Sequence, residues 1–435
     1  MLHLSCTFRR FLLLCATGTA SVFGALPSIA LAKEGDSTPP PRPWGADAFL
    51  PVTEERIAAL PAAEQSAWRA YWQASVERSK LLPPRDLVDH TPNQPVPVGT
   101  MHGSYSKGVK LNAPAAWYAT EEARTIADRV VRWQRPTGGW TKSGDYSRDP
   151  APADDHHDGW SNGTFDNDAT ITELRFLALV QEPAGNDPRA ATWRAAFLRG
   201  LDYAFAAQYP NGGFPQIYPL AGWYHDAITY NDDAMVHILE LMRDIAGQKE
   251  EFAFVPAPLA AEAAARLERG TACVLASQLQ DAAGRPTVWG QQIDALTLRP
   301  CAARNFEPIS ECSSESAGLV QFLMSIPHPS PRIVAAVDGA MLWFKTHALH
   351  NVAWNRNAPD GPGLVEKPGA PDLWARYYEV GTGRPVFGDR DRTIHYVVTE
   401  ISEERRKGYA WFNTRAAALP GQYAKWQARL AAKSP

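Results

Sequence analysis

The stretch NGGFPQIYPLAGWYHDAITYNDDA, residues 211–234, joins a Gly-Gly-aromatic turn to an acidic cluster that opens an apolar helix. Related arrangements lie about seventy residues before and after it along the chain. Upstream, WQRPTGGW (residues 133–140) leads to TFDNDATITEL (residues 164–174). Downstream, LASQLQDAAGRPTVWGQQID (residues 275–294) leads to SSESAGLVQFL (residues 313–323), a weaker copy. Self-similarity at this period predicts one supersecondary unit used three times.

Each unit is predicted to be a pair of helices, because Gly/Pro loops separate segments in which apolar residues have helical spacing. Strand-like patterns are few and short. Helices are expected over residues 120–134, 168–181, 188–208, 232–247, 260–279, 315–325 and 332–346. Helix pairs in a three-fold repeat predict an all-α fold, an (α/α) toroid whose turns and acidic helix starts gather on one rim.

The chain of 435 residues divides into three expected segments. Residues 1–32 have the pattern of a secretory signal peptide: two arginines, an apolar run and a small-x-small sequence at Ala30-Leu31-Ala32. An uncleaved membrane anchor is the alternative. Residues 33–100 are a Pro-rich N-terminal arm with a helical segment over 53–82 that breaks at Pro61, and residues 101–435 form the toroid. We therefore expect a secreted protein, periplasmic or extracellular, that is monomeric and not membrane-bound after cleavage.

Charge and cysteine content exclude some functions. Removal of the signal takes away two arginines and no acids, so the formal net charge changes from -4 to -6, which argues against nucleic-acid binding. A polyanionic ligand stays open if basic groups are local or a cation mediates. Three cysteines remain, Cys273, Cys301 and Cys312, and an exported protein could pair Cys301 with Cys312.

The acidic helix starts are the strongest candidates for a binding site. One Asp or Asn caps a helix, but Asp166-Asn167-Asp168 and Asn231-Asp232-Asp233 supply more oxygen atoms than capping needs, and Ca²⁺ prefers such ligands. The run at residues 154–158, DDHHD, is predicted instead to be a solvated charged loop. Aromatic residues beside the glycine turns either cover the core or stack on sugar rings. The late segment RYYEVGTGRPVFGDRDR (376–392) concentrates arginines suited to carboxylates.

Seven motifs, in order, resemble the family 10 pectate lyases. They are GGWTK (138–142), TFDNDAT (164–170), NGGFPQ (211–216), YNDDAM (230–235), WGQQID (289–294), ARNFEP (303–308) and RYYEVGTGRPVFGDRD (376–391). Such lyases have an (α/α)₃ toroid fold, an incomplete α/α barrel, and cleave polygalacturonate by Ca²⁺-assisted β-elimination. The resemblance covers roughly residues 104–417. It implies that residues 101–435 are the catalytic domain and leaves the N-terminal arm without an assigned function.

The family pattern also implies roles for individual residues. Asp166, counted as catalytic, and Asp232 would hold calcium, with Asp168 and Asp233 as rival ligands because the alignment allows a small shift. Arg304 would remove the C5 proton of a uronate. Substrate carboxylates and hydroxyls would be bound by Arg390, Arg384, Lys142 and Asp294.

A guanidinium group is normally protonated, so Arg304 needs a depressed pKa to act as a base. Calcium and neighbouring cations are expected to supply that depression, and activity should require calcium and rise well above neutral pH. This chain departs from the family pattern at Gly290, where Cys is usual, and at Thr141, where Pro is usual.

Three other functions stay open at this point. A glycoside hydrolase could pair Asp166 with Asp294 as its two carboxylates. A terpene cyclase is suggested by glutamine followed by Gly-Gly-Trp, and the export signal counts against it. A pectin-binding module without activity would keep the aromatic and acidic residues.

Overall fold

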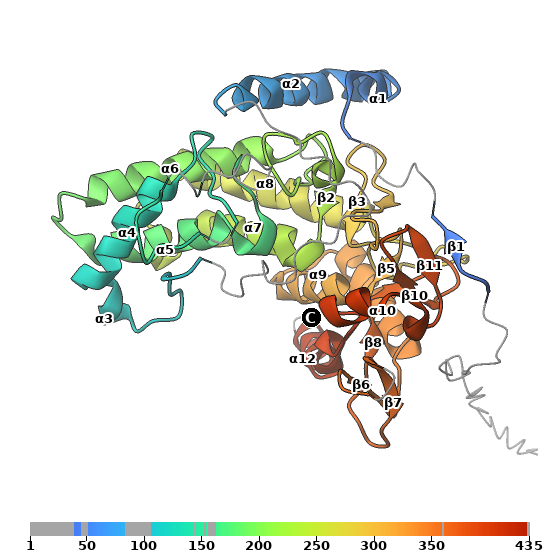
Figure 1. Cartoon of the computed structure of the whole chain (residues 1–435). Coiled ribbons are helices and arrows are strands. Elements are labelled where there is room, and N and C mark those ends of the chain that lie inside the picture. Colours follow the sequence, from blue (N-terminus) through green and yellow to red (C-terminus); the bar gives the residue numbers. More distant parts are fainter. Residues whose placement is uncertain are drawn as a thin grey trace, which may run out of the picture.

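The structure is a computed structural model that describes residues 39–44, 51–82, 106–142, 144–151, 154, 162–358 and 361–432. The predicted signal peptide, most of the Pro-rich arm and residues 155–158 of the charged loop lie outside these residues. None of the described helices is both long enough and apolar enough to cross a membrane. The described chain combines a helical body with small sheets near its C-terminal end (Figure 1).

The helical body follows the predicted pairs. It contains α4 (Glu121–Trp133), α5 (Ile171–Gln181), α6 (Ala190–Ala207), α7 (Ala234–Ala246), α8 (Ala257–Ala276), α9 (Ser313–Ser325) and α10 (Pro331–Thr346). Helices α5 and α6, α7 and α8, and α9 and α10 pack as consecutive pairs. Within one row α5 contacts α7 and α7 contacts α9, and in the other α4 contacts α6 and α8 contacts α10 (Figure 1). The predicted helices and their pairing are confirmed.

The three predicted turns share one hydrogen-bond pattern. The backbone N–H groups of Arg135, Tyr209 and Asp281 each donate to the carbonyl four residues later, at 2.8–2.9 Å. A glutamine stands one residue before Arg135, one before Tyr209 and three before Asp281. The side-chain amide of each glutamine donates to a backbone carbonyl of α6, α8 or α10. These pairs are Gln134 with Ala196, Gln208 with Arg266 and Gln278 with Ala336, at 2.8, 2.9 and 2.9 Å. The three-unit repeat is therefore present in the backbone.

Two glycines explain why the first two turns are alike and the third is weaker. Gly138 and Gly212 have φ of 100° and 94°, a region that favours glycine. A Cβ atom at these positions would lie 2.6 Å from the carbonyl oxygen of Arg199 and 2.1 Å from that of Arg269. Gly284 also has a positive φ, but nothing lies within 4 Å of its added Cβ. In the third turn the close approach involves a glycine of the helix instead, because an added Cβ at Gly339 of α10 would lie 2.3 Å from the carbonyl oxygen of Pro286.

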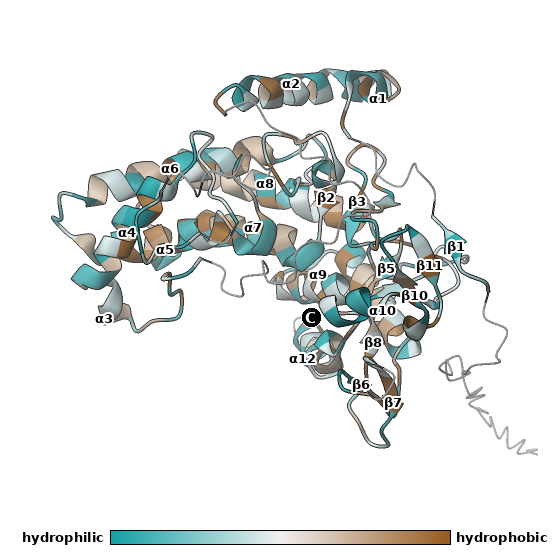
Figure 2. Cartoon of the chain, viewed as in Figure 1, coloured by the Kyte–Doolittle hydropathy of each residue, from teal (hydrophilic) through white to brown (hydrophobic). Residues whose placement is uncertain are grey.

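One large apolar core holds the helical body together. Helix α4 buries Ala123, Ile126, Ala127, Val130 and Trp133, the spacing of an amphipathic helix. Polar and apolar residues alternate along the helices of this core (Figure 2). The buried indoles of Trp140 and Trp289 each donate at 2.7 Å to a carbonyl of a preceding helix, those of Val130 and Val274. The repeat thus anchors its loops by the same contact in the first and third units.

The described chain also contains sheets, with most of their strands in its C-terminal part, so the all-α class is only partly right. A five-stranded antiparallel sheet has the order β1-β11-β10-β9-β5. Its strands are β1 (Arg42–Pro43), β5 (Glu311–Cys312), β9 (Tyr377–Tyr378), β10 (Pro385–Gly388) and β11 (Thr393–His395). Smaller sheets pair β2 (Ile228–Thr229), β3 (Gln292–Ile293) and β4 (Pro300–Cys301), β6 (Val352–Asn355) with β7 (Gly363–Glu366), and β8 (Trp374–Ala375) with β12 (Phe412–Asn413). Strands of two to four residues are too short to show alternation in the sequence.

Further helices precede and follow the helical body along the chain. They are α1 (Glu54–Ala58), α2 (Ala62–Ser79), α3 (Ala115–Tyr118), α11 (Glu403–Gly408) and α12 (Leu419–Ala431). The predicted break at Pro61 is confirmed, because Pro61 is the N-cap residue of α2. Helix α2 lies along the helical body (Figure 1) and buries Trp68 against the ring of Tyr209, with centroids 5.2 Å apart.

Candidate active site

The two acidic helix starts are short 3-10 turns with an unusual backbone. They span Asp166–Asp168 before α5 and Asn231–Asp233 before α7. In both turns the second and third residues have φ between 50° and 62°, the left-handed region that Asn and Asp tolerate best among residues other than glycine. Such strain persists only where surrounding structure holds it, and it gathers at functional sites. The same strained turn occurs in two of the three units, which supports a shared purpose.

The side chains that face Asp166 come from equivalent positions of the repeat. Lys142 and Gln216 each stand two residues after a buried aromatic, Trp140 and Phe214. The ammonium group of Lys142 pairs with one carboxylate oxygen of Asp166, and the amide of Gln216 donates to the other at 2.8 Å. Asp166 is 2% exposed. The structure therefore brings two predicted site residues, Lys142 and Asp166, into contact.

Asp232 lies in the same electrostatic field. Burial raises the pKa of its carboxyl group to about 6, and the negative charges of Asp166 and Glu315 add to the shift. The positive charges of Arg376 and Arg304 oppose it. The 3-10 turns that carry Asp166 and Asp232 contact each other, and Arg304 is near enough for its charge to lower the pKa of Asp232.

Arg304 sits in the loop between β4 and β5 and is held by one carboxylate. Its Nε and Nη2 atoms donate to Glu307 at 2.8 and 2.5 Å, and its backbone N–H donates to Glu307 at 3.1 Å. Its guanidinium carbon lies 4.9 Å from the centre of the Phe306 ring and 5.8 Å from that of Tyr409. The Arg304 side chain is still 42% exposed, so one side of the guanidinium stays open to a ligand.

The electrostatics of this pair differ from the sequence-based expectation. Burial favours the neutral form of Arg304, but the charge and hydrogen bonds of Glu307 outweigh it and raise the pKa of the guanidinium above its usual value. Burial alone would raise the pKa of Glu307, and Arg304 instead lowers it to about 2. The expected depression depended on bound calcium, and in the protein alone the buried carboxylate of Glu307 shifts the pKa of Arg304 in the opposite direction.

Sequence reasoning gave no role to several residues of this cluster. Glu307 also accepts from the hydroxyl of Tyr409 at 2.7 Å and from the amide of Gln291 at 3.3 Å. Arg376 is buried and pairs with Glu315 at the start of α9. Glu307, Gln291 and Arg376 all lie inside motifs of the family pattern, so the signal was present. A sequence does not show that they share one buried network.

The other predicted substrate residues are more scattered. Arg390 donates two 2.9 Å hydrogen bonds to Glu404, and its guanidinium lies 5.8 Å from the centre of the Phe306 ring, which Arg304 also contacts. Arg384 is exposed in the turn between β9 and β10, and among the described contacts none joins it to Asp166 or Arg304. The structure thus brings Arg390 to the cluster and not Arg384.

Asp294 and the rival calcium ligands have partners of their own. Asp294 accepts from Arg56 at 2.7 Å and from the backbone N–H of Thr297 at 2.8 Å, so its carboxylate fixes a loop. Asp168 pairs with His237, and Asp233 pairs with Arg415. Asp166 and Asp232 have partners too, Lys142 and Gln216 for Asp166 and Asn231 for Asp232, so these contacts do not decide between the rival ligands.

The cysteine and glycine predictions can also be compared with the structure. Cys273, Cys301 and Cys312 are free, buried thiols, so the suggested pairing of Cys301 with Cys312 is wrong. The thiol of Cys312 instead donates to Glu315 at 2.6 Å. At Gly290 an added Cβ would lie 2.9 Å from the Cβ of Pro300. A cysteine, which is usual here in the family, would therefore collide with Pro300 in this chain.

The residues at the two helix starts fit a calcium ion in part. Ca²⁺ takes six to eight oxygen ligands, and Asp166 and Asp232 offer two carboxylates from neighbouring loops, of which Asp166 is a buried residue and Asp232 an exposed one. The raised pKa of Asp232 reports like-charge crowding on top of burial, which a divalent cation would relieve. Within the described chain no three Asp, Glu, His or Cys side chains form a complete metal site. Further oxygen atoms would have to come from amides, water or an acidic ligand.

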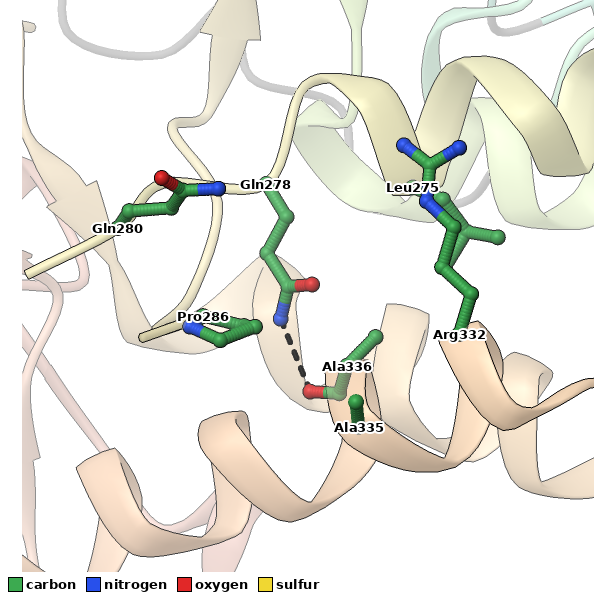
Figure 3. A pocket seen from close by; sticks show the side chains of 7 residues that line it. All are labelled: Leu275, Gln278, Gln280, Pro286, Arg332, Ala335 and Ala336. Carbon is green, nitrogen blue, oxygen red and sulfur yellow. Dashed lines mark hydrogen bonds between the residues drawn. The ribbon is translucent and has the colours of Figure 1, made fainter. Parts of the chain in front are cut away.

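A separate hollow of about 230 Å³ lies between α8 and α10 (Figure 3). Among its lining residues are Leu275, Pro286, Ala336 and Arg332. Gln278 crosses its floor through the hydrogen bond to Ala336 that closes the third repeat turn (Figure 3). With one charged side chain and no carboxylate, it lacks the acid and base groups of the cluster around Arg304.

The helical repeat, with acids on its loop side and arginines beside them, is similar to the fold of solved polysaccharide lyases. Two solved structures are similar along most of the described chain. One is a mutant of a family 10 polysaccharide lyase from Cellvibrio cellulosa in complex with trigalacturonic acid, with 31% identity and a TM-score of 0.63, covering 73% of this chain and 99% of that one. The other is a family 10 polysaccharide lyase from the same organism, with 31% identity and a TM-score of 0.61, covering 72% and 97%.

The family model described as pectic acid lyase matches residues 134–419. The chain therefore belongs to the pectic acid lyase family and is an enzyme, a pectate lyase. No curated protein matches it. The resemblance drawn from the seven motifs is confirmed.

Proposed function

We propose that this protein is a secreted, monomeric enzyme that cleaves polygalacturonate by calcium-assisted β-elimination and leaves 4,5-unsaturated oligogalacturonides. Export is supported by the signal-like sequence of residues 1–32. The acidic substrate is supported by the similar lyase, which was solved in complex with trigalacturonic acid. We further propose that residues 101–435 are the catalytic domain and that the two rows of paired helices form an (α/α)₃ toroid.

The observation that carries this proposal is that the turns of Asp166 and Asp232 contact each other, with the half-exposed guanidinium of Arg304 nearby. Asp166 and Arg304 act with opposite sign on the pKa of Asp232. A uronate needs its carboxylate charge compensated and its C5 proton removed, and such a cluster offers cationic and acidic groups side by side. Asp166 and Asp232 would hold calcium, which when bound withdraws charge from the uronate carboxylate and acidifies the C5–H bond.

The proposed elimination consumes no water. The neutral guanidine of Arg304 takes the C5 proton, and the released electron pair forms the C4=C5 double bond. The bond from C4 to its glycosidic oxygen then breaks, and the departing oxygen takes a proton from solvent, to which Arg304 later returns one. Lys142 and Arg390 would bind uronate carboxylates on either side of the reacting sugar.

The ion pair with Glu307 sets the conditions for this step. Because Glu307 raises the pKa of Arg304, the neutral guanidine is scarce at neutral pH. Activity should therefore rise as the pH increases toward the Arg304 pKa.

The test is digestion of polygalacturonate followed by ultraviolet absorbance, with and without a calcium chelator. Elimination creates a conjugated uronide that absorbs, and chelator should abolish the signal. Hydrolysis would release reducing ends with no absorbance, and a binding module would retain the polymer with no products; either result would refute the proposal.

A further inference from the structure

The N-terminal extension makes a sheet contact that the family match does not include. Strand β1 lies far outside residues 134–419, yet Arg42 pairs with Ile394 and Pro43 with Thr393 as the edge of the five-stranded sheet. The backbone N–H of Trp44 continues this pairing by donating to the carbonyl of Arg392 at 3.0 Å. The extension is therefore built into the C-terminal sheet (Figure 1).

Trp44 also completes a small apolar cluster beneath Arg304. Trp44 is 8% exposed and belongs to the same cluster as Ala302 and Phe306, which flank Arg304 two residues away on either side. The Arg392 guanidinium lies 5.8 Å from the centre of the Trp44 ring, and its Nε donates at 3.0 Å to the side chain of Asn305. Trp44 thus supports the Arg304 loop by packing and, through Arg392, by a hydrogen bond.

Helix α1 holds the other end of the same segment. Arg56 donates to Asp294 at 2.7 Å and also to the carbonyl of Pro51 at 3.0 Å. Asp294 in turn accepts from the backbone of Leu296 and Thr297, which shapes the loop that leads into β4 and on to Arg304. The segment from 294 to 306 is therefore tied to the extension near both of its ends.

We propose that the N-terminal extension, through Trp44 and Arg56, positions Arg304 for proton abstraction. Trp44 and Arg56 would act through the segment that carries Arg304, so we class them as positioning residues. The proposal rests on the proposed role of Arg304. A displacement of about 1 Å in a reacting group can cost a hundredfold in rate, so loss of this support should lower kcat far more than it changes KM.

The extension offers matched controls for this test. Trp68 is another buried tryptophan of the extension, but it packs on Tyr209 along the helical body. Arg69 is another arginine of the extension, and its partner is Glu54 at 2.6 Å, within the extension itself. Replacement of Trp68 or Arg69 removes similar contacts without reaching the segment that carries Arg304.

The experiment compares kcat and KM of the full chain carrying Trp44→Ala, Trp68→Ala, Arg56→Ala or Arg69→Ala, at a temperature where circular dichroism shows each variant folded. We expect Trp44→Ala and Arg56→Ala to lower kcat at least about tenfold with KM within about threefold, and the controls to keep both constants near wild type. Trp44→Phe should recover most of the lost kcat.

The proposal would be overturned if Trp44→Ala had the same kcat as Trp68→Ala and Arg56→Ala the same kcat as Arg69→Ala. If Trp44→Ala fails to fold, the comparison of Arg56→Ala with Arg69→Ala decides alone. Arg304→Ala is measured alongside: retained activity in that variant refutes the role of Arg304, whereas a dead Arg304→Ala with unaffected Trp44 and Arg56 variants refutes only the positioning role.

Discussion

The helical repeat and the C-terminal sheet region supply opposite charges to one site by different means. The repeat contributes Asp166 and Asp232 from loops whose geometry recurs along the sequence, over one large core. The sheet region contributes Arg304, Arg376 and Arg390 over a second, smaller cluster made from residues as distant as Trp44 and Trp411. The acids depend on local sequence that is repeated, whereas the arginines depend on contacts between remote segments.

The two regions also treat charge differently. In the repeat, burial and like charge raise the pKa of Asp232 to about 6, which leaves that region prepared for a cation. In the sheet region, the ion pair with Arg304 lowers the pKa of Glu307 to about 2, so the charge there is already compensated. A bound cation should therefore change the repeat more than the sheet region.

The largest effect is expected at Arg304. Arg304→Ala should lower kcat by at least about a thousandfold, because it removes the proposed base and leaves binding and electrostatic contributions in place. Circular dichroism and calcium binding should stay close to wild type, since the guanidinium is half exposed. Substantial elimination activity in this variant would show that Arg304 is not the base. The base would then have to come from the helical repeat.

The next effect separates the acids of the repeat. Asp166→Asn and Asp232→Asn should each raise the calcium concentration for half-maximal activity by on the order of tenfold or more, because each removes a charged oxygen donor. Calorimetric titration with calcium provides a readout independent of turnover. Asp168→Asn is the matched control, since Asp168 pairs with His237. A larger loss of calcium affinity in Asp168→Asn would identify Asp168, two residues further along the chain, as the ligand in place of Asp166.

A change in pH dependence should distinguish the sheet region. Glu307→Gln removes the negative charge that raises the pKa of Arg304, so that pKa should fall and the neutral guanidine should form at lower pH. The rising limb of the kcat profile should move down by about one pH unit or more, even though maximal kcat falls. Glu404→Gln, which removes the partner of Arg390, should leave the limb in place. If the rising limb of the pH profile stayed in place in Glu307→Gln, the ionisation of Arg304 would not be what sets the pH dependence of kcat.

The smallest effect is expected at Arg384. It is exposed in a turn away from the described cluster, so Arg384→Ala should change KM for polygalacturonate by less than about twofold. Arg390→Ala, which removes a guanidinium next to the Phe306 ring, should raise KM more. Steady-state kinetics with the polymer would settle the order, and a larger effect at Arg384 would extend the binding surface to the far edge of the sheet.

Much of the helical body can be predicted from the sequence because each unit carries local signals for its turn and its helices. Gly138 and Gly212 mark turns that only glycine fits, and the apolar spacing of the helices gives their buried faces. The short strands were missed because two to four residues cannot display a period of two. The ion pair between Arg304 and Glu307 was missed for a related reason: Glu307 stands three residues away in a loop, and nothing in the sequence shows that both side chains turn toward each other.

The sequence by itself determined the three helix-pair units, the family and the acidic helix starts, because these depend on residue types at short and repeated separations. Only the tertiary structure decided that Asp294 fixes a loop, that Arg384 stands apart, and that Trp44 and Arg56 support the segment carrying Arg304. Those contacts join residues more than two hundred positions apart, and their existence depends on how the whole chain packs.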